Sequence, residues 1–159
     1  MNAIIQAIVW SILPISELRG GIPIAIANGI SPLFAFLICV IANILVIPIV
    51  FFFLDHIHSF FMKIKIYESL FNKYIEKKRG KLEKYIGTKW EFVVLMLFVG
   101  IPLPITGAYT GTLLAWFFNV DRKEAYKALS LGVVVAGVVV SLVVYLGIAA
   151  FGLFIKNSF

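Results

Sequence analysis

Charge is scarce in this sequence. Only 14% of its 159 residues are charged and 62% are hydrophobic, whereas a soluble domain has about 25% charged and about 45–50% apolar residues. The mean hydropathy is +1.03. So few charges cannot cover so much apolar surface, which excludes an ordinary soluble protein. The composition indicates an all-α integral membrane protein of the cell membrane, with lipid as its solvent.

Cysteine and the common catalytic motifs are also missing. The one cysteine, Cys39, excludes an intrachain disulfide. The sequence has no nucleophile–base pair, Walker loop, dinucleotide fingerprint or metal-ligand spacing. His56 and His58 lie beside Asp55, where a lipid head-group region explains them better than a metal. We therefore expect no enzyme, no cofactor and no metal site.

Basic residues are present but unevenly placed. Of the 14 Lys and Arg residues, nine lie between positions 55 and 91, and three more are Arg122, Lys123 and Lys127. Arg19 and Lys156 are the other two. In a membrane protein such clustering is first of all a signal of topology, because cytoplasmic segments are enriched in basic residues. We expect no nucleic-acid partner.

Four apolar blocks occupy residues 3–30, 33–54, 92–120 and 128–154. The first and third are interrupted by proline and glycine. The second is a clean run of 22 residues, long enough to cross a bilayer at about 1.5 Å per residue. The fourth carries no charge. The order of broken and clean blocks, repeated on either side of the basic stretch, suggests a duplication.

A shift of 90 residues aligns the two halves without a gap. Over residues 13–35, the identical pairs place Leu13, Pro14, Ile15, Gly21, Ala25 and Ala35 on Leu103, Pro104, Ile105, Gly111, Ala115 and Ala125. Helix-start signals also coincide, since Ser31-Pro32 aligns with Asp121-Arg122. We predict one membrane domain over 1–159, with repeat 1 at 1–54, a linker at 55–91 and repeat 2 at 92–159.

Each broken block has two interpretations: a single spanning helix, or a re-entrant hairpin of two half-helices. If both blocks span, Arg122 and Lys123 lie on the face opposite the basic linker. If both are hairpins, 12 of the 14 basic residues share one face. The positive-inside rule favours the hairpins, with the linker cytoplasmic and both termini extracytoplasmic. The halves are then inverted repeats, each a re-entrant hairpin plus a transmembrane helix, as in many secondary transporters.

The linker has a helical pattern of its own. Apolar residues recur at spacings of three and four over residues 57–75, with lysines between them. This pattern predicts a basic amphipathic helix lying on the anionic cytoplasmic leaflet.

The sharpest polar feature is PISELRGGIP at residues 14–23. Glu17 and Arg19 lie inside an apolar block, where a charged side chain costs about 2.5–3.5 kcal/mol. They could neutralise each other and hold a hairpin tip. Alternatively, Arg19 binds an anion with the help of Ser16 and of Gly20 and Gly21, whose backbone a ligand can approach closely. Glu17 is then a protonatable coupling group.

The corresponding tip, PLPITGAYTGT at residues 102–112, is uncharged. Its hydroxyl groups could bind a polar head group or satisfy the carbonyls freed by the broken helix. The candidate binding residues here are Thr106, Tyr109, Thr110 and Gly111. Asn43, in the second block, is a further candidate, although an interhelical hydrogen bond is its simpler role.

Two stretches resemble the signatures of the small multidrug export family: ISELRGGIP at residues 15–23 and IPLPITGAYTGTLLA at residues 101–115. That family is similar to the DedA superfamily, with its VTT-type domain. The resemblance implies two inverted hairpin-plus-helix repeats and an association with flipping or scrambling of lipids, including polyprenyl phosphates. DedA proteins carry basic residues near the proline of the second hairpin, whereas the only hairpin arginine here is Arg19.

Three functions remain open at this point. The first is movement of an amphiphilic, phosphate-bearing lipid between leaflets, with or without proton coupling through Glu17, and it predicts a groove open to the bilayer. The second is efflux of cationic drugs, which predicts an enclosed central cavity. The third is a non-transporting scaffold, in which Glu17 and Arg19 pair only with each other. We expect membrane lipids as partners. We also expect a homodimer, because two full spans cannot surround two hairpins.

Overall fold

A computed structural model of the chain describes residues 2–56, 63, 65, 66, 69, 72, 73, 76, 90–103 and 106–158. Every helix it describes is an α-helix: α1 (Ala3–Ile12), α2 (Glu17–Ala27), α3 (Pro32–His56), α6 (Glu91–Gly100), α7 (Ala108–Phe117) and α8 (Arg122–Ser158). Two segments are long and apolar enough to span a membrane, namely α3 and the Arg122–Ile148 part of α8. The predicted all-α class is confirmed. The amphipathic helix predicted over residues 57–75 and His58 fall largely or wholly outside the described residues.

Proline ends the first helix of each broken block. α1 ends with Leu13 extended at ψ 131°, and α6 ends with Ile101 extended at ψ 112°. Each of these residues precedes a proline, Pro14 or Pro102, whose ring disfavours the helical conformation of the residue before it. The breaks therefore lie where the sequence predicts them.

The two long helices begin at the predicted start signals. α3 starts at Pro32, directly after Ser31. At the start of α8, the Asp121 carboxylate accepts hydrogen bonds from the backbone N–H groups of Lys123 (3.0 Å) and Glu124 (3.2 Å). An acidic N-cap satisfies amides that have no partner within the helix.

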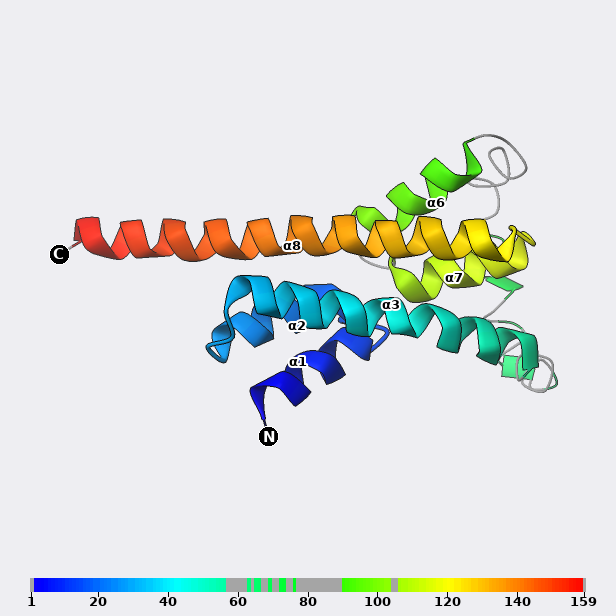
Figure 1. The fold of residues 1–159 in the computed structure, drawn as a ribbon, viewed down its shortest axis with the longest axis horizontal. Helices are drawn as coiled ribbons and strands as arrows, with labels where there is room; N and C mark the ends of the chain where they lie inside the picture. The colour runs from blue at the N-terminus through cyan, green and yellow to red at the C-terminus, as the bar shows by residue number, and fades with distance from the viewer. Residues whose placement is uncertain are drawn as a thin grey trace.

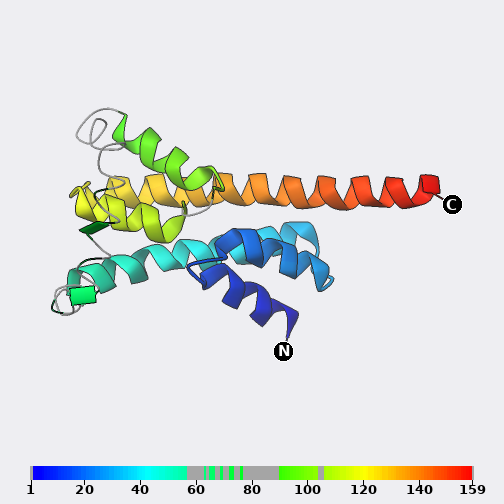
Figure 2. The same ribbon diagram turned by 180° about the vertical axis from the view of Figure 1, so that it is seen from behind.

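The helices form two hairpins and two crossing helices (Figure 1). α1 runs inward from the N-terminus, α2 returns alongside it in the opposite direction, and α3 crosses to the opposite end. α6 and α7 make a second turn from that opposite end, and α8 runs back across. The view from behind shows the same arrangement, with the two hairpin turns near the middle and α8 projecting beyond the other helices (Figure 2).

Equivalent backbone hydrogen bonds recur 90 residues apart. At the end of α2, the N–H groups of residues 28, 29 and 30 donate to the carbonyls of residues 24, 26 and 25. At the end of α7, residues 118, 119 and 120 donate to residues 114, 116 and 115. The residue that turns the chain has positive φ in both halves: Gly29 at 84° and Asn119 at 53°. Positions that align under the 90-residue shift therefore have the same local backbone geometry at the ends of α2 and α7.

Close helix contacts form the core. Buried residues of α1, α2, α3, α6, α7 and α8 belong to one apolar cluster. Gly132 lets α6 pack closely on α8, because it has no side chain. A Cβ added there would lie only 2.6 Å from the Met96 carbonyl oxygen and 2.8 Å from the Val99 Cβ. This packing holds the second hairpin against the spanning helix.

Candidate functional site

The first hairpin tip is built on a strained residue. Glu17 begins α2 with φ 46°, a left-handed conformation that costs a non-glycine residue about 1–3 kcal/mol. The Ser16 hydroxyl donates to the carbonyl oxygen of Trp10, which ties α2 to α1. Strain of this kind persists only where surrounding contacts fix it, and here those contacts come from the second hairpin.

The Glu17 side chain lies against the start of α7. It is 9% exposed. Its Oε1 atom lies 3.5 Å from the backbone nitrogen of Tyr109, which faces the carboxylate at the helix N-terminus. The carboxylate also fills the space above the Gly107 Cα, so that a side chain on Gly107 would overlap it. Positive partial charge at a helix N-terminus stabilises a carboxylate in this position.

Arg19 reaches across to the same hairpin. Its guanidinium donates to the backbone carbonyl of Thr106 and lies 3.5 Å from the Thr106 hydroxyl oxygen. Within the part of the chain that the structure describes, the ion pairs are Asp55–Arg122 and Glu124–Lys127. Glu17 and Arg19 therefore take their described hydrogen-bonding partners from the opposite hairpin rather than from each other.

Tyr109 makes the reverse connection. Its hydroxyl donates to the backbone carbonyl of Ile12 at the end of α1. Arg19 and Tyr109 thus join the two tips by hydrogen bonds to carbonyls that the helix breaks leave without a helical partner.

The hydroxyl groups of the second tip serve mostly its own backbone. The Thr106 hydroxyl oxygen lies 2.9 Å from the Ile101 carbonyl oxygen and 2.8 Å from that of Leu103. Thr112 donates to the Ala108 carbonyl at 2.6 Å, and Thr110 lies 3.4 Å from the Gly107 carbonyl oxygen. The described contacts of these hydroxyl groups are thus with backbone carbonyls of their own hairpin, both at the break before α7 and within α7 itself.

The glycines and Asn43 lie at helix contacts around the tips. A Cβ at Gly20 would meet Ser16, and one at Gly21 would meet Ser11. Gly111 faces Val99 and a leucine of α8 in the same way. Asn43 is 1% exposed and donates from Nδ2 to the Ser11 carbonyl at 2.8 Å, which is the interhelical bond expected for it.

Two small cavities flank the charged residues, and a larger groove lies beside them. A cavity of about 30 Å³ is lined by Pro14, Ile15, Glu17, Arg19, Thr106 and Thr110. A second, of about 10 Å³, includes Glu17, Arg19 and Asn43 in its wall. An open apolar groove of about 240 Å³ follows α6 and is lined by Val94, Leu97, Phe98, Ile101, Leu103 and Thr106. Thr106 lines both the groove and the cavity beside Arg19.

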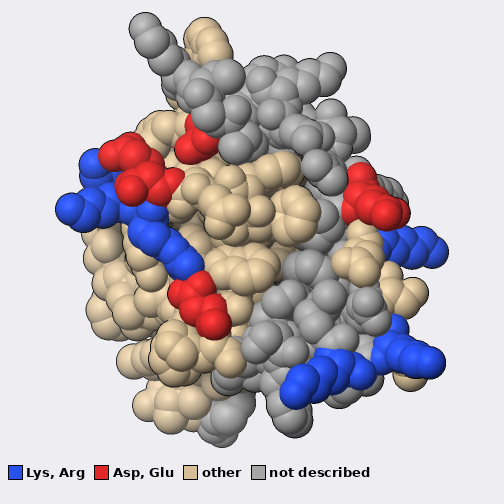
Figure 3. Space-filling view, turned by 90° about the vertical axis from the view of Figure 1, so that its right-hand side faces the viewer, with Lys and Arg blue, Asp and Glu red and all other residues tan. Residues whose placement is uncertain are grey.

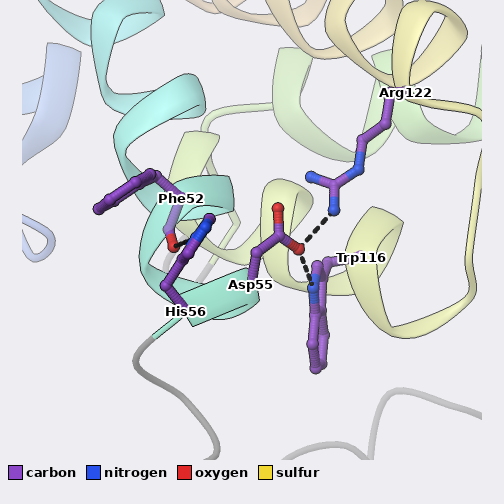
Figure 4. A network of polar contacts seen from close by, with 5 residues as sticks. All are labelled: Phe52, Asp55, His56, Trp116 and Arg122. Carbon is purple, nitrogen blue, oxygen red and sulfur yellow. Dashed lines mark hydrogen bonds and ion pairs between the residues drawn. The ribbon is translucent and has the colours of Figure 1, made fainter.

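A polar cluster joins the halves at the linker end of the molecule (Figure 4). Asp55 accepts from the Arg122 guanidinium at 2.6 Å and from the Trp116 indole N–H at 2.8 Å. Arg122 also lies 4.2 Å above the centre of the Phe51 ring. His56 turns away, with Nδ1 3.0 Å from the Phe52 carbonyl oxygen. No sequence pattern singled out this cluster. In the sequence, it corresponds to an acidic residue, Asp55, at the end of one apolar block and a basic residue, Arg122, shortly before another.

Charged side chains gather at this end. Figure 3 looks onto the end where α3 stops and α8 starts, and its described Lys, Arg, Asp and Glu atoms lie toward the two sides of this view. By contrast, Glu17 and Arg19 are the only charged residues of α1, α2 and α7. One charged pair therefore lies at the hairpin tips, remote from the charged end.

Comparison with known families decides the affiliation. The model of the family described as "Putative small multi-drug export protein" matches residues 17–139. The chain belongs to this family. The match starts at Glu17 and contains both α2 and the whole second hairpin. No curated protein and no solved structure matches the chain.

Membership of the small multi-drug export family confirms the resemblance found from the two motifs. Together with the two apolar helices, it identifies a helical membrane protein of an export class. The wider relation to the DedA superfamily stays a prediction. The binding roles of the ten candidate residues also stay predictions.

Proposed function

We propose that this small multi-drug export family member moves an amphiphilic lipid with a phosphate head group between membrane leaflets. The observation that carries the proposal is the junction at Thr106, which lines both the cavity beside Arg19 and the open apolar groove along α6. A head group at Arg19 and a hydrocarbon chain in the groove would fit one amphiphilic molecule. Glu17, which lines the same cavity, has the proton-coupling role in this proposal.

The proposed membrane arrangement is a pair of inverted repeats with re-entrant hairpins. Support comes from the helix-end hydrogen bonds that recur 90 residues apart and from the two hairpin turns that approach the middle from opposite ends (Figures 1 and 2). Non-helical backbone at mid-membrane is tolerated only when protein or water satisfies it. Arg19 and Tyr109 supply such hydrogen bonds here.

The proposed orientation places the basic linker in the cytoplasm and both termini outside. Arg122 lies beside Asp55, which precedes the linker, so the second basic cluster shares the linker's end of the molecule. In the proposed orientation, 12 of the 14 basic residues would share the cytoplasmic face, in agreement with the positive-inside rule.

The proposed partners are membrane lipids and a second copy of the chain. Residues on the outer faces of α3 and α8, among them Ile41, Leu45, Leu142 and Leu146, are apolar and more than half exposed. Either lipid or a partner protomer would cover them. Native mass spectrometry from a mild detergent tests the dimer. A species at one chain mass, 17.7 kDa, at every concentration would contradict it.

Efflux of cationic compounds is the second candidate, and the family description favours it. In that case Glu17 supplies the carboxylate that attracts the cation. Its carboxylate already lies against Gly107 and the N-terminus of α7, so a cation would have to compete with that helix end. The scaffold alternative required Glu17 and Arg19 to pair only with each other, and their bonds to the second hairpin speak against it.

A liposome assay separates the two transport functions. The purified protein is reconstituted at fixed density, and the movement of a fluorescent prenyl phosphate, a fluorescent phosphatidylcholine and a cationic dye is followed in parallel. We expect the anionic lipid to move faster than in empty liposomes, and Arg19→Ala to abolish that movement. Dye movement that depends on Glu17, with no lipid movement, would instead establish the export of cations.

A further inference from the structure

The cavity beside Arg19 is too small for the head group that the proposed function requires. Its volume of about 30 Å³ has room for about two water molecules, since one water needs about 10–15 Å³ on the same measure. A phosphate group, whose four oxygen atoms surround one phosphorus, is larger than two water molecules. If Arg19 binds such a head group, some neighbouring group must first withdraw.

Glu17 is the group in the way. Its carboxylate lines the cavity together with Arg19 and occupies the space above Gly107, at the backbone N–H of Tyr109. A carboxylate and a phosphate oxygen seek the same partners, namely a guanidinium and backbone amides at a helix start. The nine-tenths buried side chain of Glu17 is thus an anion of the chain itself, lying where an external anion would bind.

Two further features mark this position as adjustable. The φ of 46° at Glu17 stores strain that a movement of the tip would release. Glu17 and Gly107 are also equivalent positions under the 90-residue shift, and only a residue without a side chain at 107 leaves room for the carboxylate. The second tip is therefore shaped to receive Glu17.

We propose that the Glu17 carboxylate is a built-in competitor of the anionic head group, occupying its position in the closed site and withdrawing from Gly107 when the head group binds to Arg19. This inference rests on the proposed function. It makes Gly107 a specificity-determining position, and it links binding of an anion to neutralisation of Glu17 by a proton from solution.

The surroundings of Glu17 leave few other groups to share that proton. The titratable groups that face it are Arg19 of α2 and Tyr109 of α7. α1 has no ionisable side chain, and the residues through which α3, α6 and α8 line the smaller cavity are uncharged. A rise in anion affinity as the pH falls that is present in the wild type and absent from Glu17→Gln would therefore report on Glu17, because titration of the phosphate probe itself is common to both proteins.

The test measures equilibrium binding of radiolabelled farnesyl phosphate to the full-length protein in detergent, with farnesol as the uncharged competitor. Glu17→Gln removes the competing charge and keeps the size of the side chain. We expect it to bind the probe about tenfold more tightly, equivalent to about 1.4 kcal/mol. We also expect it to keep only the pH dependence that the phosphate probe itself brings, through its second pKa of about 6. Glu124→Gln, the same change at an exposed carboxylate of α8, is the matched control and should behave like the wild type.

Glu17→Asp provides a second variant in case Glu17→Gln does not fold. Its shorter side chain withdraws the carboxylate from Gly107, so binding should again be tighter than in the wild type. Unchanged or weaker binding in the folded Glu17 variants, with binding lost in Arg19→Ala, would contradict the proposal that Glu17 competes with the head group. The proposed function would remain intact. Absence of specific probe binding in the wild type and in every variant would instead overturn the proposed function.

Discussion

Arg19 and Tyr109 are 90 residues apart, and each donates a hydrogen bond to a backbone carbonyl in the hairpin to which the other belongs. Under the 90-residue shift they are equivalent positions. The exchange is therefore nearly symmetric in geometry, but only one of the two donors is charged. The site therefore combines equivalent positions of the two hairpins with a charge that only the first hairpin carries.

Arg19 has two separable roles, and substitution by lysine should divide them. A lysine ammonium can still donate to the Thr106 carbonyl, but it lacks the planar fork that holds two phosphate oxygens. We expect Arg19→Lys to remain within about 1 kcal/mol of wild-type stability and to retain only part of the lipid transport. Arg19→Ala should remain folded, lose about 1–3 kcal/mol through the unpaired carbonyl and abolish transport.

Denaturation in detergent and the liposome assay provide the two measurements. Full transport by Arg19→Lys, together with failure of Arg19→Ala to fold, would restrict Arg19 to its structural bond with Thr106.

The orientation of the chain can be tested with single cysteines. In a Cys39→Ala background, Asn2→Cys and Ser158→Cys should react with a membrane-impermeant maleimide in intact cells. Lys65→Cys, in the linker, should react only after the membrane is opened. Termini that are protected in intact cells would contradict the hairpin arrangement with extracytoplasmic ends.

Two glycines of α8 should respond oppositely to alanine. At Gly132 the new Cβ would meet the Met96 carbonyl oxygen and Val99, whereas at Gly147 nothing lies within 4 Å. We expect Gly132→Ala to lower the free energy of unfolding by about 1–3 kcal/mol, because α6 cannot retreat without losing contact with α8. Gly147→Ala should be neutral or stabilise by up to about 1 kcal/mol. Equal effects in thermal unfolding would contradict the close contact between α6 and α8.

The ion pair between Asp55 and Arg122 should couple the two halves weakly but measurably. The side chains are 36% and 43% exposed, so solvent reduces their attraction, and a double-mutant cycle with Asp55→Asn and Arg122→Gln should give about 0.5–1 kcal/mol. The coupling should fall at high salt. Glu124 and Lys127, which pair within α8 alone, provide the control for a pair that joins no two helices. A coupling energy no larger than that of Glu124 and Lys127 would contradict a stabilising role for the ion pair. The contacts of Trp116 with Asp55 and of Phe51 with Arg122 would then join the two halves.

The sequence predicts the local features of the fold well. Pro14 and Pro102 place the helix breaks because proline acts on its immediate neighbour, and Ser31-Pro32 and Asp121 place the starts of α3 and α8 because capping is local. The apolar runs then leave only two segments that are long enough to span. Each of these inferences depends on residues within a few positions of each other.

The contacts between the tips could not be predicted in the same way. Glu17 and Arg19 are two residues apart, so the sequence left open whether they neutralise each other or whether Arg19 binds an anion. The backbone conformation instead directs both toward residues 106–109. Arg19 donates to the backbone carbonyl of Thr106. Every residue has such a carbonyl, so the sequence could not indicate which one is the acceptor. Asp55 and Arg122 are 67 positions apart, so no local pattern related them.

The bond between Arg19 and Thr106 also affects the order of events during biosynthesis. The two residues are separated by 87 positions. At about 5–20 residues per second, the ribosome takes about 4–17 s to make the second partner after the first. During that interval the first hairpin can already enter the membrane, while Glu17 and Arg19 still lack the amide and the carbonyl that receive them in the finished protein. Each is then the other's nearest opposite charge along the chain, so the pairing that the folded structure does not use is available to the nascent chain.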